Sequence, residues 1–516
     1  MVPKNLWSMA TASAAGLWFA SGTHANDCST TSISNLSIPH GQVLDLSATP
    51  VNNYNYQSST LKFCNVTVTY THPGWNDTIH VSVWLPLSKW NQRLQGAGGG
   101  GFSALDSVDS LAKSVAGGYA TVGTDAGHEL NLASSDSWSL DESGKVNMPL
   151  LKDFASVALN DAAIVAKGVV SGFYGHGPRY SYWNGCSTGG RQGLMLAQRY
   201  PTAYDGILAN APAINWPEFI VAEYWPQFVM NQMKTHPPPC VIDAITAAAV
   251  KSCDGDDGVK DSVISQPSRC QFNPLTTVNH IVNCSENTVT ITRNDALVVQ
   301  KTWDGMRSSN GSFLWYGLEK GAPLSGGLSI TTCSTPSNCT GIPFPVPTDW
   351  ISQFILQNPS ADITQMSHEQ YQQILEYSRK KYDPIIGTNK PDLSTFKQAG
   401  GKLVTWHGLA DQLIFPKGTE KYYNEVEELD SSVRDFYRLF FAPGVQHCEG
   451  GNGEIPVDPL KSVVNWVEKG IAPETLLGKT EDGSRSRKLC PYPLVSVYKG
   501  GDSRDASSYA CEEASA

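Results

Sequence analysis

A glycine-rich turn near the middle of the chain limits the choice of fold more than any other segment. Residues 180–183 are aromatic enough for a buried strand, and residues 190–199 carry apolar side chains at helical spacing. Between them stands Gly185-Cys186-Ser187-Thr188-Gly189, a G-x-S-x-G turn. On such a strand-to-helix turn the serine hydroxyl is lifted to the carboxyl edge of a sheet, and the glycines leave room for the bend. The segment predicts an α/β fold with Ser187 as a nucleophile; a plain glycine-rich turn is the alternative.

Other short β-branched or aromatic runs, bounded by glycine, proline or asparagine, predict further strands. These runs cover residues 66–70, 79–85, 93–95, 119–124, 206–209, 402–406 and 436–442. A helix is expected over residues 154–169, which are rich in alanine and valine and have apolar residues at helical spacing. Strands that alternate with helices predict a parallel sheet covered by helices on both faces.

The alternation stops between about residue 213 and residue 397. Prolines cluster at residues 237–239, six cysteines occur, and tryptophan and tyrosine are frequent. We interpret residues 213–397 as a lid domain inserted into an α/β-hydrolase catalytic domain that comprises residues 26–212 and 398–516. An irregular part of a single domain is the alternative.

Two residues that follow predicted strands complete a candidate catalytic triad. A serine hydroxyl needs a base, and the base needs a carboxylate that orients it. In a fold with this turn the three residues follow in the order serine, acid, histidine. Asp411 and His447 each follow a predicted strand after Ser187, so we predict that they are the orienting acid and the base. His407 precedes the acid, and its plainer interpretation is a strand-end histidine that is hydrogen-bonded near the site.

A cysteine stands beside both the nucleophile and the base. Cys186 precedes Ser187, and Cys448 follows His447. Base and nucleophile must come within about 2.6–3.2 Å of each other, so their neighbours approach the Cα separation of about 4.4–6.8 Å that a disulfide requires. A Cys186–Cys448 bridge is therefore expected to hold the two catalytic loops together.

The oxyanion of an acyl-transfer reaction needs two backbone N–H donors. The first is expected from Thr188, directly after the nucleophile, and the second from the glycine loop at residues 98–102, with Gly99 as the chosen donor. A phosphate-cradling loop is the alternative, but no G-K-[ST] follows. Asp125 and His128 also follow a predicted strand and could line the pocket, although their order in the chain argues against triad roles.

The N-terminus has the features of a secretory signal peptide. One early cation, Lys4, precedes an apolar stretch at residues 6–20 and a small-x-small ending at Ala25, so residues 1–25 are expected to be removed. A buried helix or membrane anchor is the alternative, but the run is short and interrupted. No later segment has 18 consecutive apolar residues, so no membrane partner is expected. The charge of 37 − 48 = −11 and the lack of basic runs exclude nucleic acid as a partner.

Secretion changes the interpretation of the 12 cysteines. An even number in an oxidising compartment predicts disulfides, and the lack of a Cys-x-x-Cys pair argues against a thiolate metal site. The chain also contains six N-x-[ST] sequons, several of which are expected to be glycosylated and therefore exposed. The sequons lie at Asn35, Asn65, Asn76, Asn283, Asn310 and Asn338.

The catalytic residues and their cysteines resemble the paired Cys-Ser, Asp and His-Cys pattern of the fungal tannase and feruloyl esterase family. The resemblance extends to residues 185–193, the loop at 98–102 and the segment at 64–68, and it covers essentially the whole mature chain. It implies an α/β-hydrolase domain with a lid inserted after the sixth strand, and secreted hydrolysis of esters of phenolic acids. Thr188 and Gln192 look more like feruloyl esterases of type B, whereas the Cys64 region and residues 237–240 look tannase-like.

The same resemblance implies a calcium loop within residues 253–263. Hard Ca²⁺ prefers about 6–8 oxygen ligands, and the loop is rich in carboxylates. The implied ligands are the carboxylates of Asp254, Asp257 and Asp261 and the backbone carbonyls of Val259 and Val263. An acidic turn closed by a Cys253–Cys270 disulfide is the alternative.

The remaining disulfides are assigned by closeness in the chain. Cys28–Cys64, Cys333–Cys339 and Cys490–Cys511 are local pairs, which leaves Cys240–Cys284 by elimination. Sequence spacing alone does not determine this connectivity.

Three functional hypotheses follow. The first is a secreted serine esterase that cleaves esters of ferulate, p-coumarate or caffeate with plant cell-wall sugars through an acyl-enzyme. The second is a tannase that acts on galloyl esters. The third is a non-catalytic, wall-binding glycoprotein, which needs the triad to be accidental. A structural Ca²⁺ is expected, and an organic cofactor is not expected. The sequence does not indicate the oligomeric state.

Overall fold

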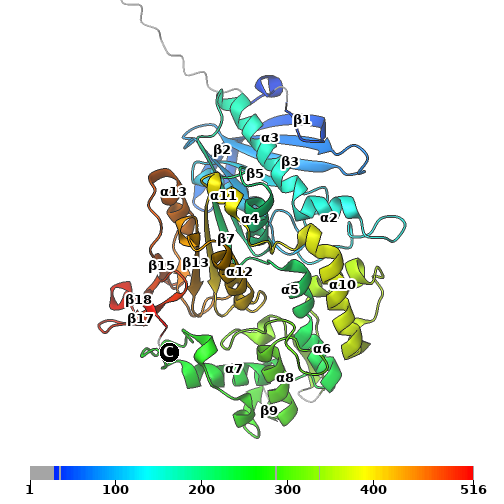
Figure 1. Ribbon diagram of the computed structural model, residues 1–516, viewed down its shortest axis with the longest axis vertical. Coiled ribbons are helices and arrows are strands. Elements are labelled where there is room, and N and C mark those ends of the chain that lie inside the picture. The colour runs from blue at the N-terminus through cyan, green and yellow to red at the C-terminus, as the bar shows by residue number, and fades with distance from the viewer. Residues whose placement is uncertain (1–27, 34–35, 285–286, 336–337, 515–516) are drawn as a thin grey trace, which may run out of the picture.

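A nine-stranded sheet forms the centre of the molecule (Figure 1). The structure is a computed structural model that describes residues 28–33, 36–284, 287–335 and 338–514. The strand order is β1-β2-β3-β5-β4-β6-β7-β12-β13. The strands are β1 Gln42–Tyr56, β2 Ser59–Thr71, β3 Ile79–Pro86, β4 Arg93–Ala97, β5 Ala120–Thr124, β6 Tyr180–Cys186, β7 Gly206–Asn210, β12 Lys402–Gly408 and β13 Tyr437–Ala442.

The sheet is mixed, so the expectation of a parallel sheet is wrong for its N-terminal part. The strands β5, β4, β6, β7, β12 and β13 pair in parallel, whereas β1, β2, β3 and β5 pair antiparallel. Only two residues join β1 to β2, which is enough for a hairpin and far too short for a parallel crossover. β1 was not predicted, because none of its 15 residues is fully buried and its apolar signal is weak.

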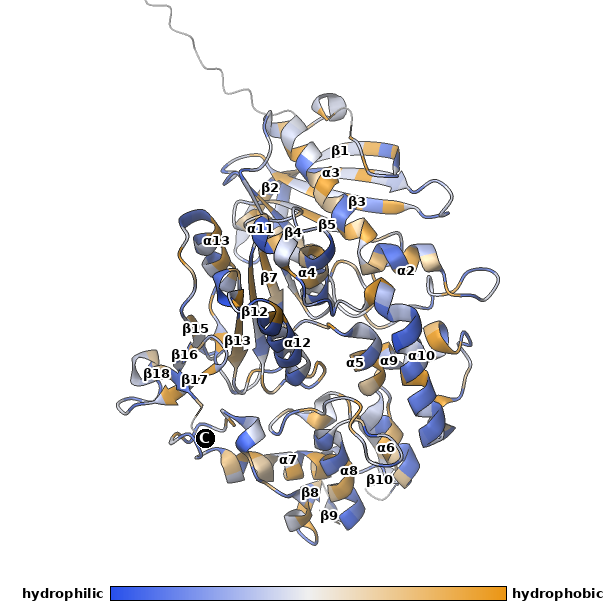
Figure 2. Cartoon of the chain, viewed as in Figure 1, coloured by the Kyte–Doolittle hydropathy of each residue, from blue (hydrophilic) through white to orange (hydrophobic). Residues whose placement is uncertain are grey.

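Helices cover both faces of the sheet, as expected. α3 (Val157–Tyr174), α4 (Thr188–Arg199) and α12 (Pro416–Leu429) lie on one face. α1 (Val108–Ala116) and α13 (Pro459–Lys469) lie on the other face. Adjacent residues of β6 show the two faces: Trp183 packs with α4, and Tyr182 packs with α13. Figure 2 shows hydrophilic and hydrophobic residues mixed along α13, whose buried residues are Val463, Val464 and Trp466.

The predicted helix at residues 154–169 is divided in the structure. α2 (Met148–Ala155) ends at Ser156, and α3 begins at Val157. Among the described residues no single helix is long and apolar enough to cross a bilayer, and only α2 and α3 taken together, bent by 58°, meet that test by length and composition.

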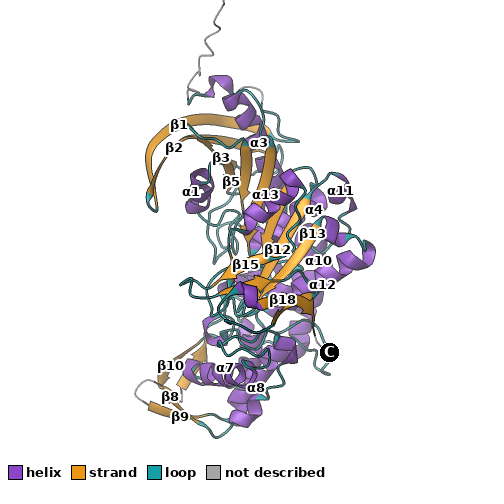
Figure 3. Cartoon of the chain, turned by 90° about the vertical axis from the view of Figure 1, so that its left-hand side faces the viewer, coloured by secondary structure: helices purple, strands orange, loops and turns teal. Residues whose placement is uncertain are grey.

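Residues between β7 and β12 add no strand to the central sheet, and most of them lie at one end of it (Figures 1 and 3). The short helix at residues 394–398 instead packs on a face of the sheet beside α4. Counted from β2, the strand before this insertion is the sixth. The insertion contains α5 Trp216–Ala222, α6 Trp225–Met233, α7 Pro239–Cys253, α8 Arg293–Asp304, α9 Pro345–Asp349, α10 His368–Ile386 and α11 Ser394–Gln398, with the strand pairs β8 Ile281–Cys284 with β9 Asn287–Thr290 and β10 Thr331–Thr335 with β11 Asn338–Gly341. Its apolar core is continuous with that of the sheet. The division into two domains stays a prediction.

The C-terminal segment forms small sheets that were not predicted. β14 (Ile455–Pro456), β15 (Leu476–Lys479) and β16 (Ser486–Leu489) make a three-stranded sheet. β17 (Leu494–Tyr498) and β18 (Tyr509–Glu513) make a hairpin. These strands are only two to five residues long, so their hydrophobic pattern is too brief to read from the sequence.

All 12 cysteines are paired, and the six disulfides have the predicted connectivity. The pairs are Cys28–Cys64, Cys186–Cys448, Cys240–Cys284, Cys253–Cys270, Cys333–Cys339 and Cys490–Cys511. No thiolate is therefore left for a metal ion.

The sequon asparagines differ in exposure. Asn76, Asn283, Asn310 and Asn338 are exposed, which suits glycan attachment. Asn65 is half-buried on β2 and its Oδ1 is enclosed, so the structure does not favour a glycan there. Asn35 and the predicted signal peptide at residues 1–25 lie outside the described residues.

Candidate active site

Ser187 stands at the turn between β6 and α4, where the sequence predicts a nucleophile. Its backbone has φ 62° and ψ −123°, a strained conformation for a residue with a side chain. A Cβ on Gly185 would lie 2.5 Å from the backbone of Gly189, so the turn requires glycine at this position. The Ser187 N–H donates to Asn210 O at 3.1 Å, which fixes the turn against β7. This is the geometry of a nucleophile elbow.

Asp411 and His447 meet at the carboxyl ends of β12 and β13. His447 Nδ1 lies 2.8 Å from Asp411 Oδ2. Asp411 is fully buried, and its Oδ1 accepts the backbone N–H groups of Leu413 and Ile414 at 2.9 and 2.8 Å. Burial alone would raise the pKa of Asp411, but the nearby histidines and their hydrogen bonds outweigh it and hold that pKa well below its usual range. Asp411 is thus a permanent carboxylate that can orient His447.

A disulfide joins the turn that carries Ser187 to the loop that carries His447. The Cys186 and Cys448 Cα atoms lie 6.0 Å apart, although 262 residues separate them in the chain. The His447 N–H also donates to Gln412 Oε1 at 3.0 Å, which ties the same loop to the acid loop. The structure therefore brings all three predicted triad residues to one edge of the sheet.

His407 contacts the same carboxylate oxygen as His447. Its Nε2 lies 3.0 Å from Asp411 Oδ2, and its Nδ1 lies 2.9 Å from Thr419 Oγ1 on α12. His407 is fully buried at the end of β12. It is thus a strand-end histidine hydrogen-bonded within the site, and its contact with the triad acid is direct.

The structure corrects the choice of Gly99 as an oxyanion donor. The Gly99 N–H already donates to Gln192 Oε1 at 2.8 Å, and Gly99 O accepts the Gly189 N–H at 2.8 Å. Gln192 Nε2 donates in turn to Ala104 O at 3.1 Å. Gly99 therefore clamps the loop to α4, and its N–H is not available to a substrate. Sequence spacing does not reveal this, because the partner comes from a different element.

Other N–H groups in this region make no hydrogen bond with the residues that the structure describes. The backbone N–H groups of Thr188 and Gly101 make no hydrogen bond to any residue that the structure describes. Thr188 Oγ1 donates to Gly101 O at 2.7 Å, which holds the two residues together. Gly101 has φ +50°, and a Cβ there would lie 1.9 Å from Leu132 O, so this position requires glycine.

Phe102 anchors the glycine loop in a cluster of aromatic rings. Its ring centroid lies 6.1 Å from that of Trp138, 6.2 Å from Trp216 and 6.0 Å from Phe354. Trp216 and Phe354 belong to the insertion, so the insertion packs on the loop that borders Ser187.

Asp125 and His128 lie apart from the triad. Asp125 Oδ2 pairs with His80 Nδ1 at 2.6 Å. His128 stacks on Trp138 with ring centroids 4.4 Å apart, and burial lowers its pKa to about 4. His128 is therefore a neutral, packed histidine at neutral pH.

Glu223 is a buried acid near the triad that the sequence did not reveal. It follows α5 at the start of the insertion, and its Oε2 has no hydrogen-bond partner among the described residues. Burial raises the pKa of Glu223 well above its usual value, and the charge of Asp411 raises it further. No motif could have revealed this contact, because the insertion brings Glu223 to Asp411 only in the folded chain.

The proposed calcium loop has suitable oxygen donors, two of which contact an arginine. Asp254 Oδ1 accepts the N–H groups of Asp261 and Val263 at 2.9 and 3.2 Å, while its Oδ2 makes no hydrogen bond within the described chain. The carbonyls of Val259 and Val263 likewise accept none there. Buried Arg487 lies 2.6 Å from Asp261 Oδ2 and 3.5 Å from Asp257 Oδ2. The residues present fit a hard cation, which would serve structure, and calcium stays a prediction.

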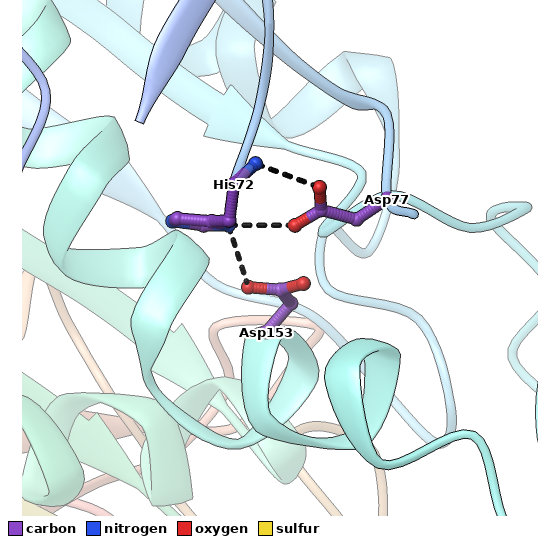
Figure 4. A group of neighbouring side chains, drawn as sticks. All are labelled: His72, Asp77 and Asp153. Carbon is purple, nitrogen blue, oxygen red and sulfur yellow. Dashed lines mark hydrogen bonds and ion pairs between the residues drawn. The ribbon is translucent and has the colours of Figure 1, made fainter. Parts of the chain in front are cut away.

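Figure 4 shows a second polar cluster that the sequence did not reveal. His72 Nδ1 lies 2.6 Å from Asp77 Oδ2, and His72 Nε2 lies 3.1 Å from Asp161 Oδ2. Fully buried Asp153 lies 3.8 Å from His72 Nδ1, and as a bare carboxylate it finds no hydrogen-bond donor among the residues that the structure describes. These groups come from the segment after β2, the segment before β3, α2 and α3.

This cluster is better described as a hydrogen-bonded network than as a metal centre. Ligand atoms around a tetrahedral ion stand about 3.3 Å apart at ordinary bond lengths, so a separation of 2.6 Å between His72 and Asp77 indicates a hydrogen bond. Burial, followed by the charge of Asp77, raises the pKa of Asp153 to about 9. Asp153 is therefore protonated at neutral pH and can donate its proton to Asp77.

Comparisons with known proteins identify the family of this chain. A family model described as "Tannase and feruloyl esterase" matches residues 64–512. A probable feruloyl esterase from Arthroderma benhamiae is 43% identical over 465 residues, which is 88% of this chain and 86% of the relative. A probable feruloyl esterase B-2 from Neosartorya fischeri is 32% identical, over 84% of this chain and 83% of the relative.

Solved structures give the same result for the fold. Feruloyl esterase B from Aspergillus oryzae superposes with a TM-score of 0.76 at 27% identity, covering 92% of this chain and 97% of that chain. Tannin acyl hydrolase from Aspergillus niger superposes with a TM-score of 0.86 at 24% identity, covering 94% of this chain and 95% of that chain. At this level of identity the likeness shows a shared fold and nothing about activity. The chain has an α/β-hydrolase fold, belongs to the tannase and feruloyl esterase family, and is a carboxylic ester hydrolase.

Proposed function

We propose that the protein is a secreted serine esterase that cleaves esters of hydroxycinnamic acids with plant cell-wall sugars. The observation that carries this proposal is the contact of His447 with Asp411, on a loop that the Cys186–Cys448 disulfide ties to the Ser187 turn. Relatives named feruloyl esterase, at 43% and 32% identity, support the substrate class. The six disulfides support an oxidising, extracellular compartment.

The proposed reaction proceeds through an acyl-enzyme. Ser187 Oγ attacks the ester carbonyl while His447 Nε2 takes the hydroxyl proton, and Asp411 stabilises the imidazolium that forms. His447 then gives the proton to the leaving sugar oxygen, which departs as an alcohol. Water attacks the acyl-enzyme by the same route, so the acid is released and Ser187 regains its proton.

The oxyanion is assigned to two N–H groups that make no hydrogen bond within the described part of the chain. The Thr188 N–H and the Gly101 N–H meet this requirement, and the contact between Thr188 Oγ1 and Gly101 O holds their residues together. We propose this pair in place of Thr188 and Gly99.

Replacement of Ser187 tests the chemistry. A Ser187→Ala protein is expected to lose at least about 10³-fold in kcat on methyl ferulate, and to lose labelling by a fluorophosphonate probe, while its folding is unchanged. Hydrolysis of methyl ferulate by the Ser187→Ala protein at the wild-type rate would rule the proposal out.

A panel of acyl groups tests the substrate. Rates on methyl ferulate, methyl p-coumarate and methyl caffeate are expected to exceed the rate on methyl gallate. The opposite order would make the protein a tannase, the second hypothesis, with the same triad.

Mass spectrometry of protein from the culture medium tests secretion, because an N-terminus at Asn26 and glycans at the exposed sequons are expected.

A further inference from the structure

The carboxylate of Asp411 is shared by two imidazoles through one oxygen. His447 Nδ1 lies 2.8 Å from Asp411 Oδ2, and His407 Nε2 lies 3.0 Å from the same atom. The triad reaction requires only the first contact. The second contact is made by a fully buried side chain that cannot reach the ester, so the mechanism above leaves it without a role.

The partners of His407 determine its protonation pattern. Asp411 carries a negative charge and accepts, so His407 Nε2 must bear a hydrogen. His407 Nδ1 lies 2.9 Å from Thr419 Oγ1, and that hydroxyl makes no other hydrogen bond within the described residues. The hydroxyl is therefore free to donate to Nδ1, so that a single hydrogen on Nε2 lets His407 satisfy both partners. His407 can then donate to Asp411 but cannot take up the proton from Ser187.

We propose that His407 is a positioning residue that sets the basicity of the catalytic histidine by drawing charge from the shared oxygen of Asp411. The inference rests on the triad proposed above. A carboxylate stabilises an imidazolium through the charge on the oxygen that faces it, and a second N–H donor to that oxygen reduces this charge. His447 therefore gives up its proton more readily, and the enzyme stays active at lower pH than a triad without His407.

Other charged groups around Asp411 do not cancel the effect of His407 on His447. Glu223 is the acid that faces Asp411 from the insertion, and burial and then the charge of Asp411 raise its pKa, which favours its neutral form. Glu449 is two residues beyond His447 and is exposed, and it lies near Asp106 of the glycine-loop segment.

The charged residues nearest to Thr419 on each side along α12 are engaged elsewhere. Lys417 pairs with Glu319 at 3.2 Å, and Glu420 accepts the Tyr492 hydroxyl at 3.2 Å. Thr419 is therefore the group on α12 that acts on His407.

The test is the pH profile of kcat/KM between pH 4 and pH 8 on a methyl ester that the wild type cleaves. The His407→Leu variant removes the donor at similar volume. Its acid-limb midpoint is expected to rise by about half to one pH unit, so that kcat/KM at pH 5 falls about 3–10-fold more than at pH 8. The His407→Gln variant places an amide N–H near the position of Nε2 and is expected to keep the wild-type midpoint.

Thr419→Val provides a second variant that keeps His407 in place. It leaves the tautomer of His407 unfixed, so a smaller upward shift of the same midpoint is expected, and Thr419→Ser is expected to show none. Equal losses at every pH with an unchanged midpoint, or a Gln variant that behaves like the Leu variant, would reduce His407 to a packing role and overturn the proposal. That result differs from failure of the proposed function, in which Ser187→Ala would itself remain active.

Discussion

Gln192 holds the glycine loop at residues 98–102, the proposed source of one oxyanion donor, against α4. Its Oε1 accepts the Gly99 N–H at 2.8 Å, and its Nε2 donates to Ala104 O at 3.1 Å. A Gln192→Leu variant leaves both backbone groups unpaired, so the loop moves and Gly101 loses its place beside Thr188. We expect kcat to fall by about 10²-fold, with a smaller change in KM.

A matched control for this variant lies on the same helix. Gln198 also makes a side-chain hydrogen bond, to the Tyr422 hydroxyl at 2.9 Å, but it contacts neither catalytic loop. Gln198→Leu is expected to retain the wild-type kcat. If both variants lost the same fraction of kcat, the helix as a whole would matter rather than the clamp on Gly99.

The site residues that could be predicted from the sequence are those that stand in a recognisable motif or in a fixed order along the chain. Ser187 stands in a G-x-S-x-G motif, which is typical of one strand-to-helix turn. In this fold the acid and the histidine follow the serine in that order, and this order selects Asp411 and His447. Gly99, His407 and Glu223 differ, because their roles depend on Gln192 of α4, Thr419 of α12 and Asp411 after β12. Such contacts exist only after the elements have packed, and no local pattern encodes them.

At the scale of elements, the disulfide between Cys186 and Cys448 links the end of β6 to the loop after β13. A Cys186→Ala, Cys448→Ala double variant is expected to unfold at lower temperature, because the bridge closes a long loop and contributes about 2–5 kcal/mol. kcat is expected to fall as well, since His447 loses its covalent tie to Ser187. Thermal unfolding and the kcat value on methyl ferulate are the measurements.

The Cys333–Cys339 disulfide gives the comparison for that variant. It closes a short hairpin loop between β10 and β11, in the insertion. Alanine at both of these positions is expected to leave kcat unchanged. A kcat for the Cys186, Cys448 variant equal to that of the wild type would show that packing alone positions the two loops.

The junction of α2 with β2 and β3 is expected to weaken as the pH rises. Asp153 has a pKa of about 9 in the fold, against about 4 in the unfolded chain, so the folded state binds one more proton between those values. Its contribution to stability is complete below about pH 4 and is lost progressively up to about pH 9. An Asp153→Asn variant supplies a permanent amide donor to Asp77 in place of this proton.

The comparison is therefore between two pH dependences. The free energy of unfolding of the Asp153→Asn variant should match that of the wild type near pH 4 and exceed it by a few kcal/mol near pH 8. Urea unfolding at both pH values measures this difference. A constant difference between the two proteins at all pH values would mean that Asp153 does not carry the proton.

The strands that could be predicted from the sequence are the ones whose residues are mostly buried. Every predicted strand of the central sheet is present, because residues such as those of β5, β7 and β12 are buried almost throughout. β1 has only exposed and half-buried residues, and its pairing with β2 depends on a two-residue turn. The antiparallel half of the sheet therefore could not be foreseen from hydrophobic runs.

At the scale of the whole molecule, the insertion is fastened to the C-terminal segment by buried charges. Arg487 lies 2.6 Å from Asp261 Oδ2 of the insertion, and Arg485 donates to Asp261 O at 3.1 Å. Within the C-terminal segment, Glu454 lies 3.1 Å from each of these arginines. The proposed calcium loop thus lies where the insertion meets the C-terminal sheet. Loss of an ion there should loosen the contact between these two parts and not the chemistry at Ser187.

Calcium is therefore expected to change stability more than catalysis. Chelation should lower the Tm by about 3–5 °C, because a ligand that binds only the folded state stabilises it by about 2.7 kcal/mol at 100 times its Kd. Added Ca²⁺ should restore the Tm, and kcat measured at temperatures well below the Tm should not change.

An Asp254→Asn variant should show the lower Tm both with chelator and with added Ca²⁺, since Asp254 offers the carboxylate oxygen that makes no hydrogen bond within the described residues. Asp256 is exposed in the same loop and is not a proposed ligand, so Asp256→Asn should respond to calcium as the wild type does. A wild-type Tm that ignores both chelator and Ca²⁺, together with no bound calcium by elemental analysis, would leave Arg487 as the group that neutralises this loop.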